Sequence, residues 1–207
     1  ERWWSRVTPD LLIFARAKLA DARDTDSGAH LERVRTYSRI IAEQLSKQSK
    51  ERDNINTDFV RLIYLTSPLH DIGKVGIPDC VLLKPGRLSD VEFDIMKEHA
   101  MLGAQTLDAA LRMFPNTKFL NMARAIAATP HERWDGTGYP AGLKGADIPL
   151  CGRIVAVADV YDARSSKRAY KDAFNHYVAR SIIVEESGSH FDPDVVDAFL
   201  NCGAQFI

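Results

Sequence analysis

The sequence predicts an all-α protein, in which amphipathic helices form a bundle around one core. Apolar residues recur at helical spacing in several stretches; in residues 29–48 one face carries Val34, Tyr37, Ile41 and Leu45. With 207 residues, 45% of them hydrophobic, the chain can bury a sizeable core without disulfides. We expect residues 1–23 to form an appended helix and residues 24–207 to form the domain itself.

Charge and cysteine usage limit the classes of function. The 27 basic and 28 acidic residues give a formal net charge of −1, so a polyanion such as DNA meets no general attractive field. The three cysteines show no CxxC spacing, which argues against a disulfide framework or a thiolate zinc site and favours a reducing, cytoplasmic setting. No apolar run approaches the roughly 18 residues of a membrane span. We expect neither a nucleic-acid partner nor a membrane span in this chain.

Residues 8–25 are the first predicted helix. Thr8 can cap it, Pro9 occupies its first turn, and helical spacing is kept by Leu12, Ala15, Leu19 and Ala22. Two interpretations stay open for this helix. It either packs against the domain, or it is a connector or homodimerising helix that follows an upstream receiver or sensor domain.

The second predicted helix runs from about Ala29 to Gln48 and carries a histidine on its buried face. His30 precedes the four apolar positions of this helix by four, seven, eleven and fifteen residues, so all five share one face. A single inward histidine is more often a hydrogen-bonded core residue than a metal ligand. Because the chain has further candidate ligands, we favour the metal-ligand interpretation of His30.

The third predicted helix leads to the pair His70-Asp71, which sets two metal-ligand types side by side. Pro68 should kink or locally re-register this helix because proline lacks a donor for the preceding turn. Gly73 should then let the backbone turn sharply. Lys74 lies within a turn of the pair, where it can hold a phosphate oxygen or be an ordinary solvated lysine near a helix C-terminus.

A connecting loop is expected at residues 77–86, and the next helix begins with the capping-box pattern of Ser89 and Glu92. In this helix His99 shares its inner face with Phe93, whereas Lys97 should point away.

A further helix, Lys118 to Ala128, should end at Thr129-Pro130 because proline disfavours helical geometry in the residue before it. This places His131 at a helix terminus.

Residues 134–145 contain four glycines and a proline, so a shaped, irregular loop is expected, and such loops often carry binding. The apolar helix that follows contains Asp159, where an unpaired carboxylate would be costly and a nearby cation would remove the cost. Asp162 follows one turn later, beside a basic cluster that includes Arg168 and Lys171. This cluster is either a solvated surface or a phosphate clamp. Two closing helices complete the chain.

Separate segments therefore each direct an imidazole or carboxylate towards the interior: His30, His70 with Asp71, His99, His131 and Asp159. Histidines and carboxylates without cysteine suit a hard or borderline divalent ion such as Fe, Mn or Zn. Helical bundles build such centres from inward-facing side chains. The sequence thus predicts a metal centre inside the bundle.

Two segments resemble the signatures of the HD-GYP domains, a branch of the HD superfamily of metal-dependent phosphohydrolases. Residues 70–79 are similar to the HD signature, and residues 131–140 to the signature that adds GYP to the name. The resemblance covers about residues 24–201, and it includes Gly-Ala-His at 28–30, Lys-x-His at 97–99 and Val-Ala-Asp at 157–159. It implies an HD-superfamily helical bundle with an irregular, glycine-rich GYP loop.

The resemblance also implies an activity and a site. Two divalent ions, most often iron or manganese, would activate a water that hydrolyses cyclic di-GMP to linear pGpG, and in some members on to GMP. The implied metal ligands are His30, His70, Asp71, His99, His131 and Asp159. Asp71, bridging the ions, and Lys74 would be the catalytic residues. The implied substrate contacts are Gly138, Tyr139, Pro140, Asp162, Arg168 and Lys171.

Two departures from the family pattern fall at metal-ligand positions, whereas those at Lys167 and Ala169 touch no ligand. Asp26 stands where a glutamate usually supports a third metal ion, and its side chain is one methylene shorter. Pro130 stands where the family has a second histidine next to His131, and proline cannot bind a metal. The change at Asp26 should weaken binding of a third ion, and the change at Pro130 should weaken binding of the second ion.

Three functions remain in competition. The first is a cyclic di-GMP phosphodiesterase that acts as the output domain of a signalling protein. The second, motivated by Pro130, is a catalytically impaired module that binds cyclic di-GMP or a protein partner such as a diguanylate cyclase. The third is an HD phosphohydrolase for another cyclic dinucleotide, such as cyclic GMP-AMP, or for a nucleotide. A purely structural bundle leaves Asp159 and the inward histidines unexplained.

Overall fold

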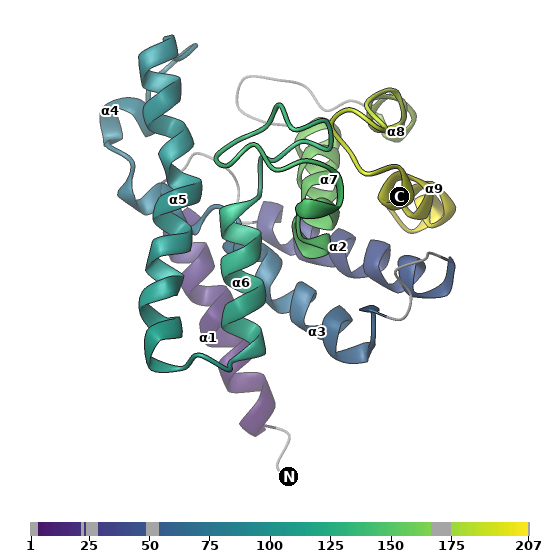
Figure 1. The fold of residues 1–207 in the computed structure, drawn as a ribbon, viewed down its shortest axis with the longest axis horizontal. Coiled ribbons are helices and arrows are strands. Elements are labelled where there is room, and N and C mark those ends of the chain that lie inside the picture. Colours follow the sequence, from purple (N-terminus) through teal and green to yellow (C-terminus); the bar gives the residue numbers. More distant parts are fainter. Residues whose placement is uncertain (1–3, 22, 24–28, 49–53, 167–174, 207) are drawn as a thin grey trace.

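The computed structural model describes residues 4–21, 23, 29–48, 54–166 and 175–206. Within these residues the regular structure is helical, and the only pairings of strand type are two isolated β-bridges, which confirms the predicted all-α class. The α-helices, shown in Figure 1, are α1 (Trp4–Asp21), α2 (Ala29–Gln48), α3 (Thr57–Thr66), α4 (Asp79–Leu82), α5 (Asp90–Met113), α6 (Lys118–Ala128), α7 (Leu150–Ser165), α8 (His176–Glu185) and α9 (Pro193–Asn201). Short 3₁₀ helices connect them: η2 (Ser67–Leu69), η3 (Ile72–Gly76), η4 (Gly145–Asp147) and η5 (Gly203–Phe206).

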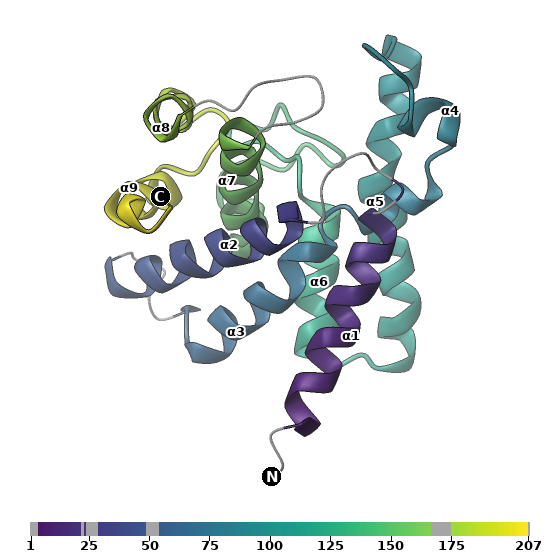
Figure 2. The ribbon, with the colours of Figure 1, turned by 180° about the vertical axis from the view of Figure 1, so that it is seen from behind.

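Helix α2 is the central packing element. It packs against α3, α7 and α9, whereas α5 packs against α6 and η3. Figures 1 and 2, seen from opposite sides, show α2 beneath α7 and α9 with α3 alongside it. The largest side chains of the resulting core are fully buried and come from α2, α3, α7, α9 and the α8–α9 connection: Ile41, Leu45, Ile63, Ile154, Tyr161, Phe191 and Phe199.

The boundaries of α2 and α6 agree with the predicted ones. Helix α3 ends at Thr66, and Pro68 then lies in the first turn of η2, so the predicted re-registration at this proline is confirmed. Both hydrogen bonds of the predicted capping box are present at the start of α5: Glu92 N donates to Ser89 Oγ (3.3 Å), and Ser89 N donates to Glu92 Oε2 (2.7 Å).

The expected loop over residues 77–86 was wrong in part, because Asp79–Leu82 forms the single-turn helix α4. Four residues are too few to show helical periodicity.

Helix α1 begins at Trp4, so the predicted start with Thr8 as cap and Pro9 in the first turn was wrong. It packs against η2, η3 and α3. Its Ala17 is buried in a small second cluster with Leu31, Leu69 and Ala123. Its Leu12 and Leu19 are exposed. The contacts support the packing interpretation of this helix, while its role as a connector or dimerising helix stays a prediction.

Gly73 brings η3 and α5 together. A Cβ at this position would overlap the carbonyl oxygen of His99 and the amide nitrogen of Gly103. The predicted reason for this glycine, a sharp turn, was wrong: it lies within the 3₁₀ helix η3 and is not among the glycines with positive φ. Glycine here permits the close backbone contact that holds the His70-Asp71 segment against α5.

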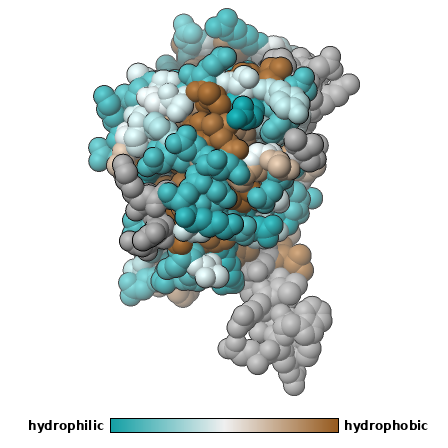
Figure 3. Space-filling model, turned by 90° about the vertical axis from the view of Figure 1, so that its right-hand side faces the viewer, coloured by the Kyte–Doolittle hydropathy of each residue, from teal (hydrophilic) through white to brown (hydrophobic). Residues whose placement is uncertain are grey.

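The side of the molecule formed by α8 and α9 is mostly hydrophilic, with a hydrophobic patch in its upper half (Figure 3). Apolar side chains contribute much of the surface of any folded domain, so we assign no role to this patch. Among the described residues, no helix combines the length and the apolar character that crossing a membrane requires.

Candidate metal centre

The predicted ligands come from five parts of the fold and meet at one place. His30 lies at the start of α2, and His70 and Asp71 lie between η2 and η3. His99 is on α5, His131 follows α6, and Asp159 is on α7. The ligand atoms fall into two groups, in each of which they lie within 4.8 Å of one another: His30, His70 and Asp159, and then Asp71, His99 and His131.

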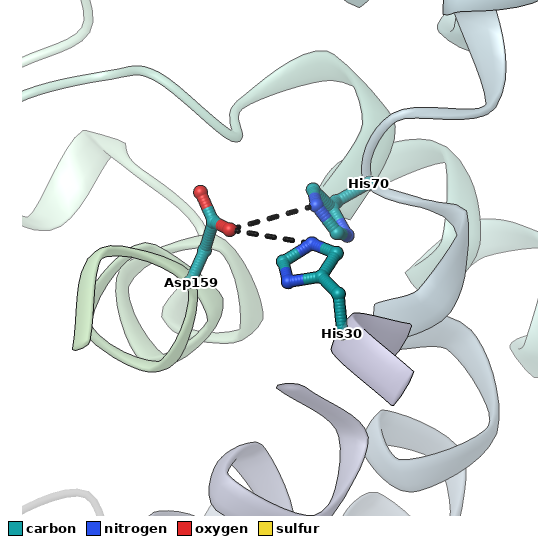
Figure 4. A group of neighbouring side chains, drawn as sticks. All are labelled: His30, His70 and Asp159. Carbon is teal, nitrogen blue, oxygen red and sulfur yellow. Dashed lines mark ion pairs between the residues drawn. The ribbon is translucent and has the colours of Figure 1, made fainter. Parts of the chain in front are cut away.

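In the first group both imidazoles point at the Asp159 carboxylate (Figure 4). Asp159 Oδ1 lies 3.6 Å from His30 Nε2 and 3.9 Å from His70 Nε2. Two ligand atoms that share one cation at about 2.1 Å are separated by roughly 3.0–3.5 Å. The spacing is therefore close to that of a loaded site. Asp159 was expected to be buried, but its side chain is 19% exposed.

The second group is more compact. His99 Nε2 lies 3.4 Å from Asp71 Oδ1 and 3.1 Å from His131 Nε2. His131 Nε2 is 4.0 Å from the same carboxylate oxygen. Burial lowers the pKa of His99 and lowers that of His131 to about 4, so both imidazoles are neutral near pH 7 and have a lone pair for a metal.

Asp71 faces both groups. Its Oδ1 belongs to the second group, while its Oδ2 lies 3.5 Å from His70 Nε2 of the first. Lys74 Nζ lies 2.8 Å from Oδ2. Burial opposes ionisation of this carboxyl, but Lys74 and then the surrounding histidines hold its pKa well below the usual value. An ionised carboxylate with one oxygen towards each group is the arrangement that a bridging ligand needs.

Two atoms of the centre show that its residues fit metal ions. His70 Nε2 and Asp71 Oδ1 are fully buried and have no hydrogen-bond partner among the described residues. Leaving such groups unsatisfied is costly, and native proteins seldom do so without a reason. Because both atoms are aimed at the space that the other ligands surround, a cation there would satisfy them. Histidine and carboxylate donors without sulfur indicate Fe, Mn or Zn.

In three of the four histidines, a hydrogen bond at Nδ1, the ring nitrogen that does not face the centre, orients the imidazole. His70 Nδ1 donates to the Ser67 carbonyl oxygen (2.8 Å), and His99 Nδ1 donates to the Met96 carbonyl oxygen (2.7 Å). Since a carbonyl can only accept, the proton is on Nδ1 and the Nε2 lone pair faces the centre. His30 Nδ1 lies 2.7 Å from Asp162 Oδ2 in the corresponding arrangement. Such outer partners are typical of metal-binding histidines.

Asp162, expected to contact substrate, lies behind His30 instead. Its side chain is 1% exposed and also accepts hydrogen bonds from Arg33 and Ser166. Burial raises the pKa of Asp162, but the bonds from His30 and Arg33 outweigh it, and the net shift is downward. Conversely, burial lowers the pKa of His30, but the Asp162 bond and the Asp159 charge give a net rise. The geometry makes Asp162 a residue that positions a ligand.

The GYP loop covers the second group. The Tyr139 ring centroid lies 4.9 Å from that of His131, and Tyr139 N donates to His131 O (3.2 Å). A Cβ at Gly138 would overlap the backbone of residues 131–133, so only glycine allows this fold of the loop. Pro140 lines a hollow of about 230 Å³ beside α5 and α6, and none of the candidate metal ligands is among the lining residues. The predicted irregular loop is confirmed, since most of residues 134–145 lie outside helices and strands.

Some predicted residues are not brought to the centre. Asp26, Arg168 and Lys171 lie outside the described residues. Pro130 is buried next to His131 and has no side-chain donor for a metal.

Two supporting residues had not been predicted. Glu132 is buried and accepts hydrogen bonds from Ala141 N (2.8 Å) and Leu143 N (3.0 Å), which fixes the GYP loop. Arg33 holds Asp162. Arg33 is three residues after His30 on α2, and this spacing was the available signal. An acidic residue beside a glycine-rich loop is a weaker signal for Glu132.

An all-α fold with two adjacent histidine and aspartate groups around one shared carboxylate defines a class of helical metal-binding domains. The chain belongs to the HD domain family, whose model matches residues 17–195. The His70-Asp71 pair and the Gly138–Pro140 loop are both present, so it is an HD-GYP-type domain.

Comparison with known proteins gives relatives of high identity. The chain is 50% identical over 202 residues to a cyclic di-GMP phosphodiesterase of Vibrio cholerae serotype O1, covering 98% of this chain and 41% of that protein. It is 44% identical to a cyclic di-GMP phosphodiesterase of Thermotoga maritima (88% of this chain, 46% of that protein). It is 40% identical to a 3'3'-cGAMP-specific phosphodiesterase of V. cholerae (98% and 36%). The chain thus spans less than half the length of these relatives.

A solved structure supports the fold alone. A cyclic GMP-AMP-specific phosphodiesterase of V. cholerae superposes with a TM-score of 0.61 at 20% sequence identity, covering 94% of this chain and 50% of the other.

Proposed function

We propose that this domain is a metal-dependent phosphodiesterase that hydrolyses cyclic di-GMP to linear pGpG, as the output domain of a signalling protein. The observation that carries the proposal is Asp71, whose two carboxylate oxygens face two groups of metal-ligand side chains. Relatives at 50% and 44% identity that are named cyclic di-GMP phosphodiesterases support the choice of substrate.

Different residues of the chain would bind the metal ions and contact the phosphate. His30, His70 and Asp159 would hold one divalent ion and His99 and His131 would hold the other, with the Asp71 carboxylate facing both groups. A pair of divalent ions, iron or manganese, supplies Lewis acidity towards a phosphate and activates water. Lys74, paired with Asp71, places a cation where it can hold a nonbridging or leaving oxygen of the phosphodiester. The Tyr139 ring packs against His131 of the second group.

The test is Asp71→Ala with cyclic di-GMP as substrate. Because this carboxylate serves both groups, we expect no pGpG or GMP by chromatography after incubation with Mn²⁺ or, anaerobically, Fe²⁺. Circular dichroism should show the helical content of the wild type. Turnover by the variant in the presence of metal contradicts the proposed site.

A second substrate follows from the 40% identical relative that is named a 3'3'-cGAMP-specific phosphodiesterase. Hydrolysis of cyclic di-GMP and cyclic GMP-AMP in parallel decides between the two. Binding of either dinucleotide without product, together with turnover by Pro130→His, identifies an impaired receptor instead. The phosphate contacts of Arg168 and Lys171, a third ion at Asp26, a homodimer, an upstream receiver or sensor domain and a diguanylate cyclase partner stay predictions.

A further inference from the structure

A hollow of about 340 Å³ lies at the start of α5 and is lined by Arg87, Leu88, Asp90 and Phe93. Its volume is within the range of small-molecule sites, about 300–1,000 Å³. Figures 1 and 2 show that α4 and the first turns of α5 project beyond the rest of the domain, on the side where the α6–α7 loop lies.

Phe93 connects this hollow to the metal centre. It was expected to share the inner face of α5 with His99, but its side chain is 46% exposed. The Phe93 and Tyr139 rings meet edge to face with centroids 6.1 Å apart, and the Tyr139 ring in turn lies against His131. One aromatic ring thus separates the hollow from a metal ligand.

The positive charge of Lys97 lies along this connection. Lys97 was expected to point away, yet its Nζ is 5.2 Å from the Phe93 ring centroid and 6.0 Å from that of Tyr139. It also pairs with Asp94 at 2.5 Å. An ammonium group near both rings suits the phosphate that joins a base in the hollow to a phosphodiester at the metal centre.

The wall of the hollow is fixed to α5. Glu92 accepts from Lys84 Nζ at 2.6 Å and from Ser89 N at 2.7 Å, so the segment that carries Arg87 and Leu88 is tied to the helix that carries Phe93. The rim of the hollow thus combines an aromatic ring, a guanidinium and a carboxylate.

We infer that Phe93, Arg87 and Asp90 form a binding site for one guanine base of a cyclic dinucleotide. The inference rests on the proposed function. Aromatic side chains stack on nucleobases, arginine donates to guanine O6 and N7, and a carboxylate accepts from the guanine N1–H and 2-amino groups. Adenine has a donor amino group where guanine has O6, so Arg87 disfavours adenine.

The test compares Phe93→Leu with Phe93→Tyr and with the control Val91→Ala, at a residue of the same helix that is 71% exposed. The measurements are KM for cyclic di-GMP, KM for the base-free diester methyl p-nitrophenyl phosphate, and the Kd of cyclic di-GMP for metal-stripped protein. Loss of stacking should raise the cyclic di-GMP KM and Kd about 5- to 150-fold. The KM of the base-free diester should change by less than half of that factor. Phe93→Tyr should retain binding, and Val91→Ala should match the wild type.

Arg87→Ala tests the choice of base. The ratio of the Kd for cyclic di-AMP to the Kd for cyclic di-GMP should fall towards one. An unchanged ratio overturns the guanine assignment.

The outcomes separate this site from the proposed function. Equal losses on both substrates in Phe93→Leu mean that Phe93 only braces Tyr139, and they overturn the inference. If the protein forms product but Phe93→Leu and Val91→Ala have the same KM and Kd for cyclic di-GMP, the inferred base site is also overturned. The proposed function then stands. If cyclic di-GMP binding depends on Phe93 but no product forms, the inferred base site stands and the proposed phosphodiesterase activity is refuted.

Discussion

Asp162 is the residue whose observed position most changes the expected chemistry, because it orients His30. Asp162→Asn keeps the shape of the side chain but removes the negative charge that holds the His30 Nδ1 proton and Arg33. Loss of a partner of this kind typically lowers metal affinity about 10- to 100-fold. We expect a loss of that size for Mn²⁺ by isothermal titration calorimetry. Asp197→Asn, at an exposed position of α9, is the control. Unchanged affinity in a folded Asp162→Asn protein contradicts this role.

The convergence of the six candidate ligands was predictable one residue at a time, since each has a metal-binding side chain on the inner face or at the end of a predicted helix. Their partners were not. Asp162 and His30 are 132 positions apart, and their contact depends on how α2 packs on α7. Glu132 likewise binds amides nine and eleven residues ahead of it, which requires the folded loop. Local periodicity carries no information on such pairings.

Gly73 controls the packing of one element on another, η3 on α5. Gly73→Ala would place a methyl group on the carbonyl oxygen of His99, and backbone cannot move aside as a flexible side chain does. We expect urea denaturation to show a loss of about 3 kcal/mol or more, at the upper end of overpacking costs. Mn²⁺ affinity should fall as well, because Asp71 moves relative to His99. Gly203→Ala, where the nearest atom is 3.9 Å from the added Cβ, should be tolerated. Equal stability of the two variants contradicts the close-packing role.

The start of α5 should lose stability in acid. The bond from Lys84, and then those from Ser89, lower the pKa of Glu92 from 4.5 to about 2. Because the folded pKa is the lower one, this stabilisation is complete above about pH 4.5 and is lost as the pH falls towards 2. The thermal midpoint of Glu92→Gln should therefore lie below that of the wild type at pH 7, and the two should converge only as the pH falls through about 2. Glu98→Gln, on the exposed face of α5, is the control. A difference that does not depend on pH contradicts the assignment.

The bounds of an element were most predictable where it is long and has a clear apolar stripe. Helix α2 has twenty residues and a clear apolar stripe, so its bounds followed from periodicity and its flanking turn residues. Helix α4 has four residues and gives no such signal. The capping box of α5 was visible because its two hydrogen bonds link residues three positions apart.

At the scale of the whole molecule, the sequence predicts a helical class and convergence on one centre, but not that the centre divides into two groups around Asp71. That division depends on the distances among α2, α5, α7 and η3. Ions that bind only the folded chain raise the free energy of unfolding of the whole domain. Two separate groups should therefore stabilise it in two separate steps.

Mn²⁺ added to chelator-treated protein should therefore bind in two steps of different affinity. The group of His30, His70 and Asp159 also has Asp71 Oδ2 close by, whereas Asp71 and His99 share the second ion with His131 alone, because Pro130 contributes no donor. Each ion adds about 2.7 kcal/mol to the free energy of unfolding at a concentration 100 times its Kd. Calorimetric titration and thermal midpoints should show the tighter step unchanged and the weaker step lost in His131→Ala. In Pro130→His the weaker step should move to lower Mn²⁺ concentration, since an added imidazole raises the affinity of the second site. If His131→Ala weakens both steps equally, the two groups act as one site and the division around Asp71 is wrong.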